Sequence, residues 1–344
     1  MKPEASALNG LLPTLLASAL AAVSLPATAQ NVQLYGLADG GIAVTNFDGQ
    51  TTSAVRENRT GRWGMRGNEK ISPNLTVLFQ LESEVDFGTG QTDTEKGMFA
   101  RQAWLGLKGG FGTVRIGQTK GLYDDLSEEI DPFRNDGIVG DFSKLAWRVN
   151  VANSRISNSV TYSAPKMAGL ELAGQYGFDE QATGGHSAFA LSAKYELRDL
   201  VLIAAYDRPL VLPAAGVTPA QSDAYMAGAA YRIGPVRLSA SYNYGDLKAE
   251  KSKLEAYTVG ATLDLGGGTA KAVYSRLNSE LPLAKQTKKN RDVSVTGIGY
   301  DYPLSKRTTL YVLGMYEDVG QVVGKVGIKE GSTKGVQAGM SFRF

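Results

Sequence analysis

The chain ends in the stretch Gly335-Val336-Gln337-Ala338-Gly339-Met340-Ser341-Phe342-Arg343-Phe344. Every second residue from Val336 onward is apolar, whereas Gln337, Ser341 and Arg343 occupy positions between them. Successive side chains of a β-strand point to opposite faces of the sheet. The stretch therefore predicts a strand with one apolar and one polar face.

The same period of two continues through most of the chain, starting at Gln33. We assign sixteen such strands, at residues 32–46, 60–69, 75–88, 98–108, 111–118, 157–165, 169–178, 187–197, 199–208, 222–232, 235–245, 254–265, 268–278, 292–302, 307–318 and 333–344. Three of them, 98–108, 292–302 and 307–318, are apolar on both faces. Short turns alternate with longer polar connections, which fall near 47–59, 89–97, 119–156, 179–186, 209–221, 246–253, 279–291 and 319–332. A strand with its connection takes about 20 residues, which fits strands of about 10 residues.

Two architectures show this alternation. In a soluble β-sandwich the apolar faces pack on each other across a core. Here we find no linker, no helical stretch and no sign of a second domain, and an even number of strands joined alternately by short and long connections is typical of a transmembrane β-barrel. We therefore predict an all-β fold, a 16-stranded antiparallel transmembrane β-barrel formed by residues 30–344. A barrel of this size encloses an aqueous channel, so the expected function is that of a pore.

The first 29 residues have the features of a secretory signal peptide. Lys2 gives a weakly basic start, and the stretch from 11 to 25 is mostly Leu and Ala. Ala27-Thr28-Ala29 provides small residues at a cleavage site, which makes Gln30 the expected first residue of the mature chain. The alternative is a buried N-terminal helix. Beyond this leader no run approaches the ~20 apolar residues that a membrane-spanning helix needs.

The composition excludes several classes of function. The 344 residues include 36 basic and 34 acidic side chains, so the clustered basic excess of a nucleic-acid-binding protein is absent. The chain has no cysteine, which excludes disulfides, thiol catalysis and cysteine-based zinc sites. Its one histidine, His186, lies in a Gly-rich connection and is the only imidazole available as a general base. We expect no catalytic activity, no cofactor and no metal.

Several motifs are shared with one family. They are VQLYGLADGGI at 32–42, RWGMRG at 62–67, FQLE at 79–82, FARQAWLGL at 99–107, FGTVRIG at 111–117, NSVTYSAP at 158–165 and the terminal Phe344. Together they resemble the general porins of β-proteobacterial outer membranes, most densely over residues 32–178. The resemblance implies a homotrimer in the outer membrane of a Gram-negative bacterium, with each third loop folded into its own lumen. Its expected partners are outer-membrane lipid, lipopolysaccharide, ions and small hydrophilic solutes.

Charged residues suggest where such a pore would be narrowest. The longest connection, 119–156, carries a series of acids, among them Asp124, Asp125, Glu128, Glu129 and Asp131. Candidate basic residues of the opposing wall are Arg62 and Arg66, which share one face of a strand, Arg115, which has the polar phase of its strand, and Arg148, near the end of the long connection. Arg101 joins them through the resemblance alone, because its strand is apolar on both faces.

Acids facing arginines across a narrow, poorly hydrated gap would act strongly on passing ions. The alternative is a solvated acidic surface loop with arginines paired locally. We expect passive diffusion of ions and small hydrophilic solutes, or else a channel that prefers anions or dicarboxylates and depends on the same arginines. A barrel enzyme would need a nucleophile and base at the rim, and an adhesin would have a closed lumen.

Overall fold

The computed structural model describes residues 31–92, 97–143, 154–179, 187–209, 222–248, 252–283, 286–319 and 331–344. The expected leader, His186 and Arg148 lie outside these ranges. Seventeen strands are described: β1 Asn31–Phe47, β2 Gln50–Arg56, β3 Arg62–Ser72, β4 Leu75–Glu84, β5 Gln102–Gly109, β6 Gly112–Lys120, β7 Arg155–Ser163, β8 Leu170–Gly177, β9 Ala188–Leu197, β10 Leu200–Arg208, β11 Ser222–Ile233, β12 Val236–Leu247, β13 Ser252–Leu265, β14 Gly268–Leu283, β15 Gln286–Pro303, β16 Thr308–Val319 and β17 Gly331–Arg343. Two helices, α2 Leu122–Ile130 and α3 Gly137–Ser143, lie between β6 and β7.

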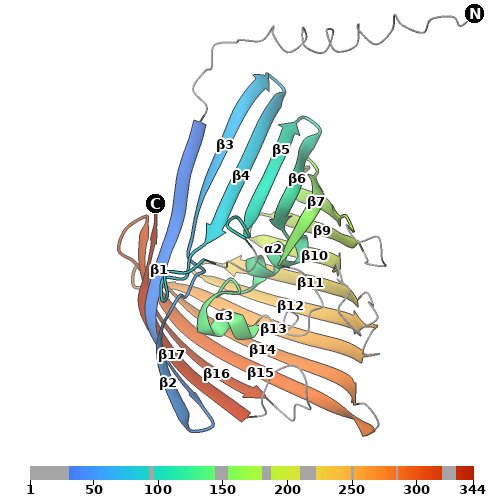
Figure 1. Cartoon of the computed structure of the whole chain (residues 1–344). Coiled ribbons are helices and arrows are strands. Elements are labelled where there is room, and N and C mark those ends of the chain that lie inside the picture. The colour runs from blue at the N-terminus through green and yellow to red at the C-terminus, as the bar shows by residue number, and fades with distance from the viewer. Residues whose placement is uncertain are drawn as a thin grey trace, which may run out of the picture.

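The strands close into a sixteen-stranded antiparallel barrel (Figure 1). Strand β1 pairs with β17, which joins the first strand to the last. On its other side β1 pairs with β2 along residues 41–47 and with β3 along residues 31–37. Because β2 and β3 follow each other along one side of β1, they are two halves of a single barrel strand. The predicted fold class is confirmed.

Two of the expected long connections are wrong. Residues 47–59 do not form a loop, because β1 and β2 are joined by a tight turn at Asp48 and Gly49. Both turn residues have positive φ, 45° and 86°, as the two-residue turns that match strand twist require. At 279–291, β14 and β15 extend the hairpin to residues 283 and 286. Neither hairpin extension was predicted, because the residues at the ends of these long strands are mostly polar and resemble a loop.

The outward face of the barrel is apolar. Seven aliphatic side chains of the described strands are at least 58% exposed: Leu34, Ile42, Leu105, Ile116, Ile233, Ile298 and Val336. Their neighbours in the sequence point inward, as the alternation predicts. Within the described ranges, no helix is long and apolar enough to cross a membrane.

The segment that carries α2 and α3 lies inside the barrel (Figure 1). Helix α2 packs its apolar side on inward residues of β10 and β11, in a cluster that includes Leu126, Ile130 and Met226. Around α3 a second cluster joins Phe133, Ile138 and Val139 to Leu313 and Met315 of β16 and to other inward residues of the wall. Each buried side chain of this size stabilises the contact by roughly 1.5–3 kcal/mol.

Glycines of the wall make room for this segment. A Cβ atom on Gly297 of β15 would lie 2.1 Å from Cγ1 of Val139. A Cβ atom on Gly260 of β13 would lie 2.6 Å from Cδ of Pro132. The close approach of helix and wall therefore depends on residues without a side chain.

Candidate functional site

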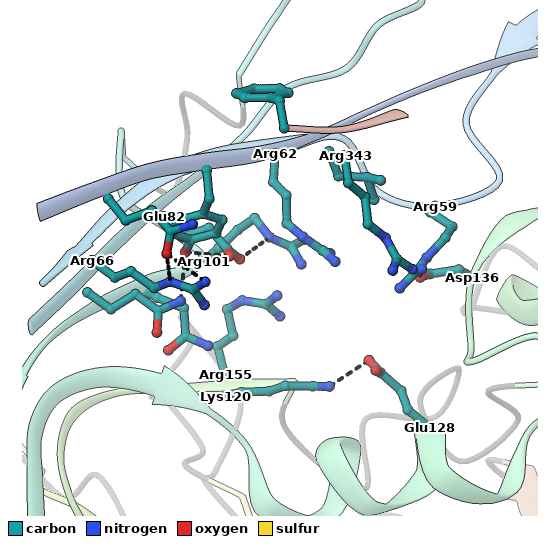
Figure 2. Close-up of a pocket in the computed structure, with 17 residues that line it drawn as sticks. Arg59, Arg62, Arg66, Glu82, Arg101, Lys120, Glu128, Asp136, Arg155 and Arg343 are labelled. Carbon is teal, nitrogen blue, oxygen red and sulfur yellow. Dashed lines mark hydrogen bonds and ion pairs between the residues drawn. The ribbon is translucent and has the colours of Figure 1, made fainter. Parts of the chain in front are cut away.

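A cavity of about 400 Å³ lies between the inner segment and the wall formed by β1 and β3–β7. Its charged lining comprises seven basic and three acidic side chains: Arg59, Arg62, Arg66, Arg101, Lys120, Arg155 and Arg343, with Glu82, Glu128 and Asp136. Figure 2 shows them converging on one space from several strands and from the inner segment. Among the described residues, no group of three or more His, Asp or Glu side chains is arranged to hold a metal ion.

Arg101 is neutralised within the wall. Its Nε lies 2.8 Å from a carboxylate oxygen of Glu82, and its Nη1 lies 3.2 Å from Glu84. Glu82 also accepts a 2.9 Å hydrogen bond from the hydroxyl of Tyr35. Two carboxylates around one guanidinium leave little positive charge at this point for a passing ion.

Arg62 and Arg155 differ from Arg101 in the charged groups that surround them. In the described part of the chain, no carboxylate lies within 4.0 Å of either guanidinium. The Nε of Arg155 is buried and has no hydrogen-bond partner. Both side chains extend toward the space in front of Glu128 (Figure 2). Arg66 and Arg343 also line the cavity without a carboxylate partner among the described residues, but they are exposed, whereas Arg62 and Arg155 are half-buried.

On the facing side, acids of the inner segment gather around Lys120. Its Nζ lies 2.6 Å from Glu128, 3.2 Å from Asp125 and 4.0 Å from Asp124. Of these acids Glu128 lines the 400 Å³ cavity. Lys120, at the end of β6, is 19% exposed. Glu128 shares Lys120 with Asp124 and Asp125, and its second oxygen lies 3.5 Å from Nη2 of Arg134, so its negative charge is offset by two cations.

Two further acids expected at the narrow point have other contacts. Glu129 lies 3.2 Å from Nζ of Lys194, on β9. Asp131 is buried and accepts hydrogen bonds from the backbone N–H groups of Phe133 (2.8 Å) and Asn135 (2.9 Å). Asp131 thus closes the turn between α2 and α3, the common role of an aspartate that bonds backbone groups two residues ahead.

Among the expected basic residues, Arg62, Arg66 and Arg101 line the cavity. The guanidinium of Arg66 donates two hydrogen bonds to Gln33, of 2.9 and 3.1 Å, and lies 5.0 Å from the centre of the Tyr35 ring. Arg115 lies elsewhere, in a second cavity behind α2.

Arg59, which was not predicted from the sequence, lies in an inward bend and lines the cavity. The bend, residues 57–61, separates β2 from β3. The carboxylate of Glu57 stabilises it by accepting 2.8 Å hydrogen bonds from the N–H groups of Gly61 and Phe87. No sequence signal distinguishes such a bend from an ordinary loop, because one of the two bonds of its carboxylate goes to Phe87, which follows β4 and lies far along the chain.

Asp39 of β1 fixes the bend to the wall. Its carboxylate is 2% exposed and accepts a 2.8 Å hydrogen bond from the N–H of Asn58 and a 2.7 Å hydrogen bond from the hydroxyl of Tyr311. The next residue, Arg59, lies 3.9 Å from Asp136 of the inner segment. Asp39 is therefore a positioning residue, because it places Arg59 between the wall and the inner segment.

We expect Asp39→Ala to reduce ion discrimination in the same direction as Arg59→Gln. Removing the carboxylate leaves two buried donors unsatisfied, at about 1–3 kcal/mol each, so the bend should no longer hold one geometry. Reversal potentials in a salt gradient measure the effect, and the double variant should show much less than the sum of the two. Tyr311→Phe, which keeps the bond to Asn58, is the matched control. Additive shifts would exclude a positioning role.

Comparison with known proteins places this architecture in a family. A family profile described as Gram-negative porin matches residues 16–320. The chain belongs to the Gram-negative porin family. It is 27% identical to an outer membrane porin of Bordetella pertussis, over 92% of this chain and 98% of the relative. It is 28% identical to outer membrane porin protein 32 of Delftia acidovorans, over 87% of each chain.

Solved structures agree with the fold. The anion-selective porin from Comamonas acidovorans has a TM-score of 0.77 at 24% identity, covering 92% of this chain and all of that one. OmpT of Vibrio cholerae in a trimer form has a TM-score of 0.67 at 16% identity, covering 92% of this chain and all of that one. This porin is thus an outer-membrane channel and not an enzyme.

Proposed function

We propose that this porin is a homotrimeric, passive diffusion channel that prefers anions and admits small hydrophilic solutes. The observation that carries the proposal is the pair Arg62 and Arg155, two half-buried guanidinium groups without a carboxylate partner in the described residues, in the cavity between the inner segment and the wall. Guanidinium groups stay charged at every physiological pH. Their planar N–H groups bind carboxylates and phosphates in pairs.

The acids of the cavity oppose this charge only weakly. Glu82 is held by Arg101 at 2.8 Å, and Glu128 is held by Lys120 at 2.6 Å. An ion in the gap therefore meets these carboxylates as parts of ion pairs, and it meets Arg62 and Arg155 as net charges. Fixed charge of one sign at a constriction favours the opposite ion.

Two of the structural comparisons support the proposal. The Comamonas acidovorans porin is described as anion-selective, and the Vibrio cholerae structure is described as a trimer. Both share the barrel architecture of this chain. The cavity of about 400 Å³ beside the inner segment also favours a diffusion channel over an adhesin, whose lumen would be closed.

Single-channel recording in a planar bilayer under a potassium chloride gradient tests the proposal. We expect conductance steps in groups of three and a reversal potential of the sign that chloride permeation produces. A reversal potential of the opposite sign would overturn the anion preference. Steps that never group in threes would overturn the trimer.

A further inference from the structure

A third cavity, of about 340 Å³, adjoins the first one along β1, β3, β4 and β5. The two cavities share Gln33, Arg66 and Gln80. Beyond these residues the third cavity is lined by Asn68, Leu78 and Trp104, which lie nearer to the short turns of the barrel. Its volume lies within the range of about 300–1,000 Å³ that small-molecule sites occupy. A solute that leaves the first cavity toward the short turns therefore meets this wall.

Arg66 offers this cavity one free edge of its guanidinium. Its Nε and Nη2 both donate to Oε1 of Gln33, and the Tyr35 ring lies 5.0 Å from Cζ. Among the described residues, Nη1 has no hydrogen-bond partner and no carboxylate lies within 4.0 Å of the group. The edge formed by Nη1 and the second N–H of Nη2 matches the two oxygens of a carboxylate. The contacts with Gln33 and Tyr35 hold the guanidinium in place before any solute arrives.

Trp104 and Leu78 give the same wall an apolar surface. Both have the inward phase of their strands, and neither belongs to the two clusters that hold the inner segment. The indole N–H donates a 3.0 Å hydrogen bond to Gln102, and Cζ of Arg115 lies 5.7 Å from the ring centre on β6. The ring is thus fixed and its polar atom is satisfied. Such a surface suits a flat apolar ring, which stacks favourably on an aromatic side chain.

Two amides of the wall have free hydrogen-bonding groups. Gln80 donates a 2.7 Å hydrogen bond to the hydroxyl of Tyr35, which leaves its Oε1 without a partner in the described part of the chain. The amide of Asn68, which is exposed, makes no hydrogen bond to any described residue. A bound ring that carries a hydroxyl group would find both a donor and an acceptor here.

The charges around this wall favour an anion. Lys70 and Lys108 have the inward phase of β3 and β5, and no carboxylate of a described residue lies within 4.0 Å of either ammonium. On β1 and β3–β6, the described inward positions between Glu82 and the short turns include no acid. Glu69 has the outward phase, and the terminal carboxylate of Phe344 accepts a bond from Gly36 on the opposite side of β1 from β3.

We propose that this wall is a binding subsite for aromatic carboxylates of the size of benzoate or a hydroxybenzoate. The carboxylate binds the free edge of Arg66, the ring lies against Trp104 and Leu78, and a ring hydroxyl reaches the amide of Asn68. Binding itself does not depend on the sign of ion selectivity. Only the use of the subsite during uptake rests on the proposed function.

Crystals of the porin soaked with 4-bromobenzoate locate the subsite, because bromine gives an anomalous X-ray signal. We expect a bromine peak beside Trp104 and Leu78, with carboxylate density at the free edge of Arg66. A peak absent from this wall would overturn the proposal.

Calorimetric titration of the detergent-solubilised porin with sodium benzoate measures the contribution of each group. We expect Arg66→Gln to weaken binding by about tenfold or more, since it removes a charged hydrogen-bond donor. Trp104→Leu should weaken it by about twofold to tenfold through the loss of ring stacking. Lys108→Gln is the matched control, because it removes an inward charge from the strand of Trp104 without touching the cavity. Equal losses in Arg66→Gln and Lys108→Gln would show a general effect of charge and overturn the subsite.

Two further probes test the wild-type porin and need no variant. Acetate keeps the carboxylate and lacks the ring, and benzyl alcohol keeps the ring and lacks the charge, so each should bind more weakly than benzoate by about tenfold. Acetate that binds as tightly as benzoate would overturn the role of the ring. A bromine peak at the wall together with a cation-type reversal potential in potassium chloride would support the subsite and overturn the anion preference. An anion-type potential without the peak would do the reverse.

Discussion

Replacing Arg62 and Arg155 together with glutamine is expected to move the reversal potential of this porin strongly toward that of a cation-preferring channel. The two guanidinium groups have no carboxylate within 4.0 Å among the described residues, so the variant removes two net positive charges from the narrow part of the lumen. Glu82 and Glu128 remain, and each is still held by its own cation. The change therefore alters the field without releasing a buried acid.

The size of the effect follows from Coulomb's law. A unit charge about 8 Å from an ion contributes about 0.5 kcal/mol in bulk water and about 2 kcal/mol at an effective dielectric constant near 20. Each arginine should then raise the permeability to chloride by between about twofold and about thirtyfold and lower the permeability to potassium by the same factor, so that their ratio changes by the product of the two factors. Bi-ionic and gradient reversal potentials in a planar bilayer measure this ratio for the double variant and for each single one.

Arg66→Gln is the control for this experiment. Its guanidinium also faces the lumen, but it is exposed, bonded to Gln33 and stacked on Tyr35. Water screens an exposed charge, so its removal should shift the permeability ratio much less. Equal shifts for Arg66→Gln and Arg62→Gln would show that selectivity arises from the charge of the whole lumen and not from the narrow part.

The barrel could be predicted from the sequence because the alternation of apolar and polar residues can be recognised within each strand alone. Alternation in segments such as 333–344 indicates directly which side chains lie on the outward face of the barrel. The strands at 292–302 and 307–318 looked anomalous because both of their faces are apolar. The structure explains the second of them, since Leu313 and Met315 point inward and pack against the segment that holds α3. An apolar inner face was therefore the sequence signal of a helix folded into the lumen.

The narrow part of the lumen was predictable only in part. Period-two phase predicts an inward side chain for Arg62, which lines the first cavity, but phase does not tell on which side of α2 a side chain lies. Arg115 has the same phase as Arg62 and lies in a different cavity. Arg59 was missed because its role depends on a pairing with Asp136, far along the chain. Lys120 was missed because its pairing with Glu128 depends on how α2 packs against the end of β6.

Removing residues 124–141 is expected to raise the single-channel conductance. The inner segment occupies the lumen and is fixed to the wall by two apolar clusters. Because Lys120 and Arg155 are paired at the ends of β6 and β7, a short connection can replace the deleted residues without disturbing the barrel. Since a sixteen-stranded barrel without an inner segment is an open aqueous channel, we expect an increase of about twofold or more.

Tyr123→Phe is the control for this deletion, because it weakens one contact of the inner segment without removing the segment. The hydroxyl of Tyr123 donates a 2.6 Å hydrogen bond to Asn243 of β12, and burial raises its pKa far above the ordinary value, so it stays a donor at every working pH. Losing this one bond should leave conductance near that of the wild type, because the apolar contacts of Leu126 and Ile130 remain.

If the deletion also left conductance unchanged, the segment would not limit the flow of ions, and the narrow part would have to be formed by the wall alone. A deletion that raises conductance and also weakens the anion preference would instead show that Arg62 and Arg155 act only while the inner segment holds ions close to them.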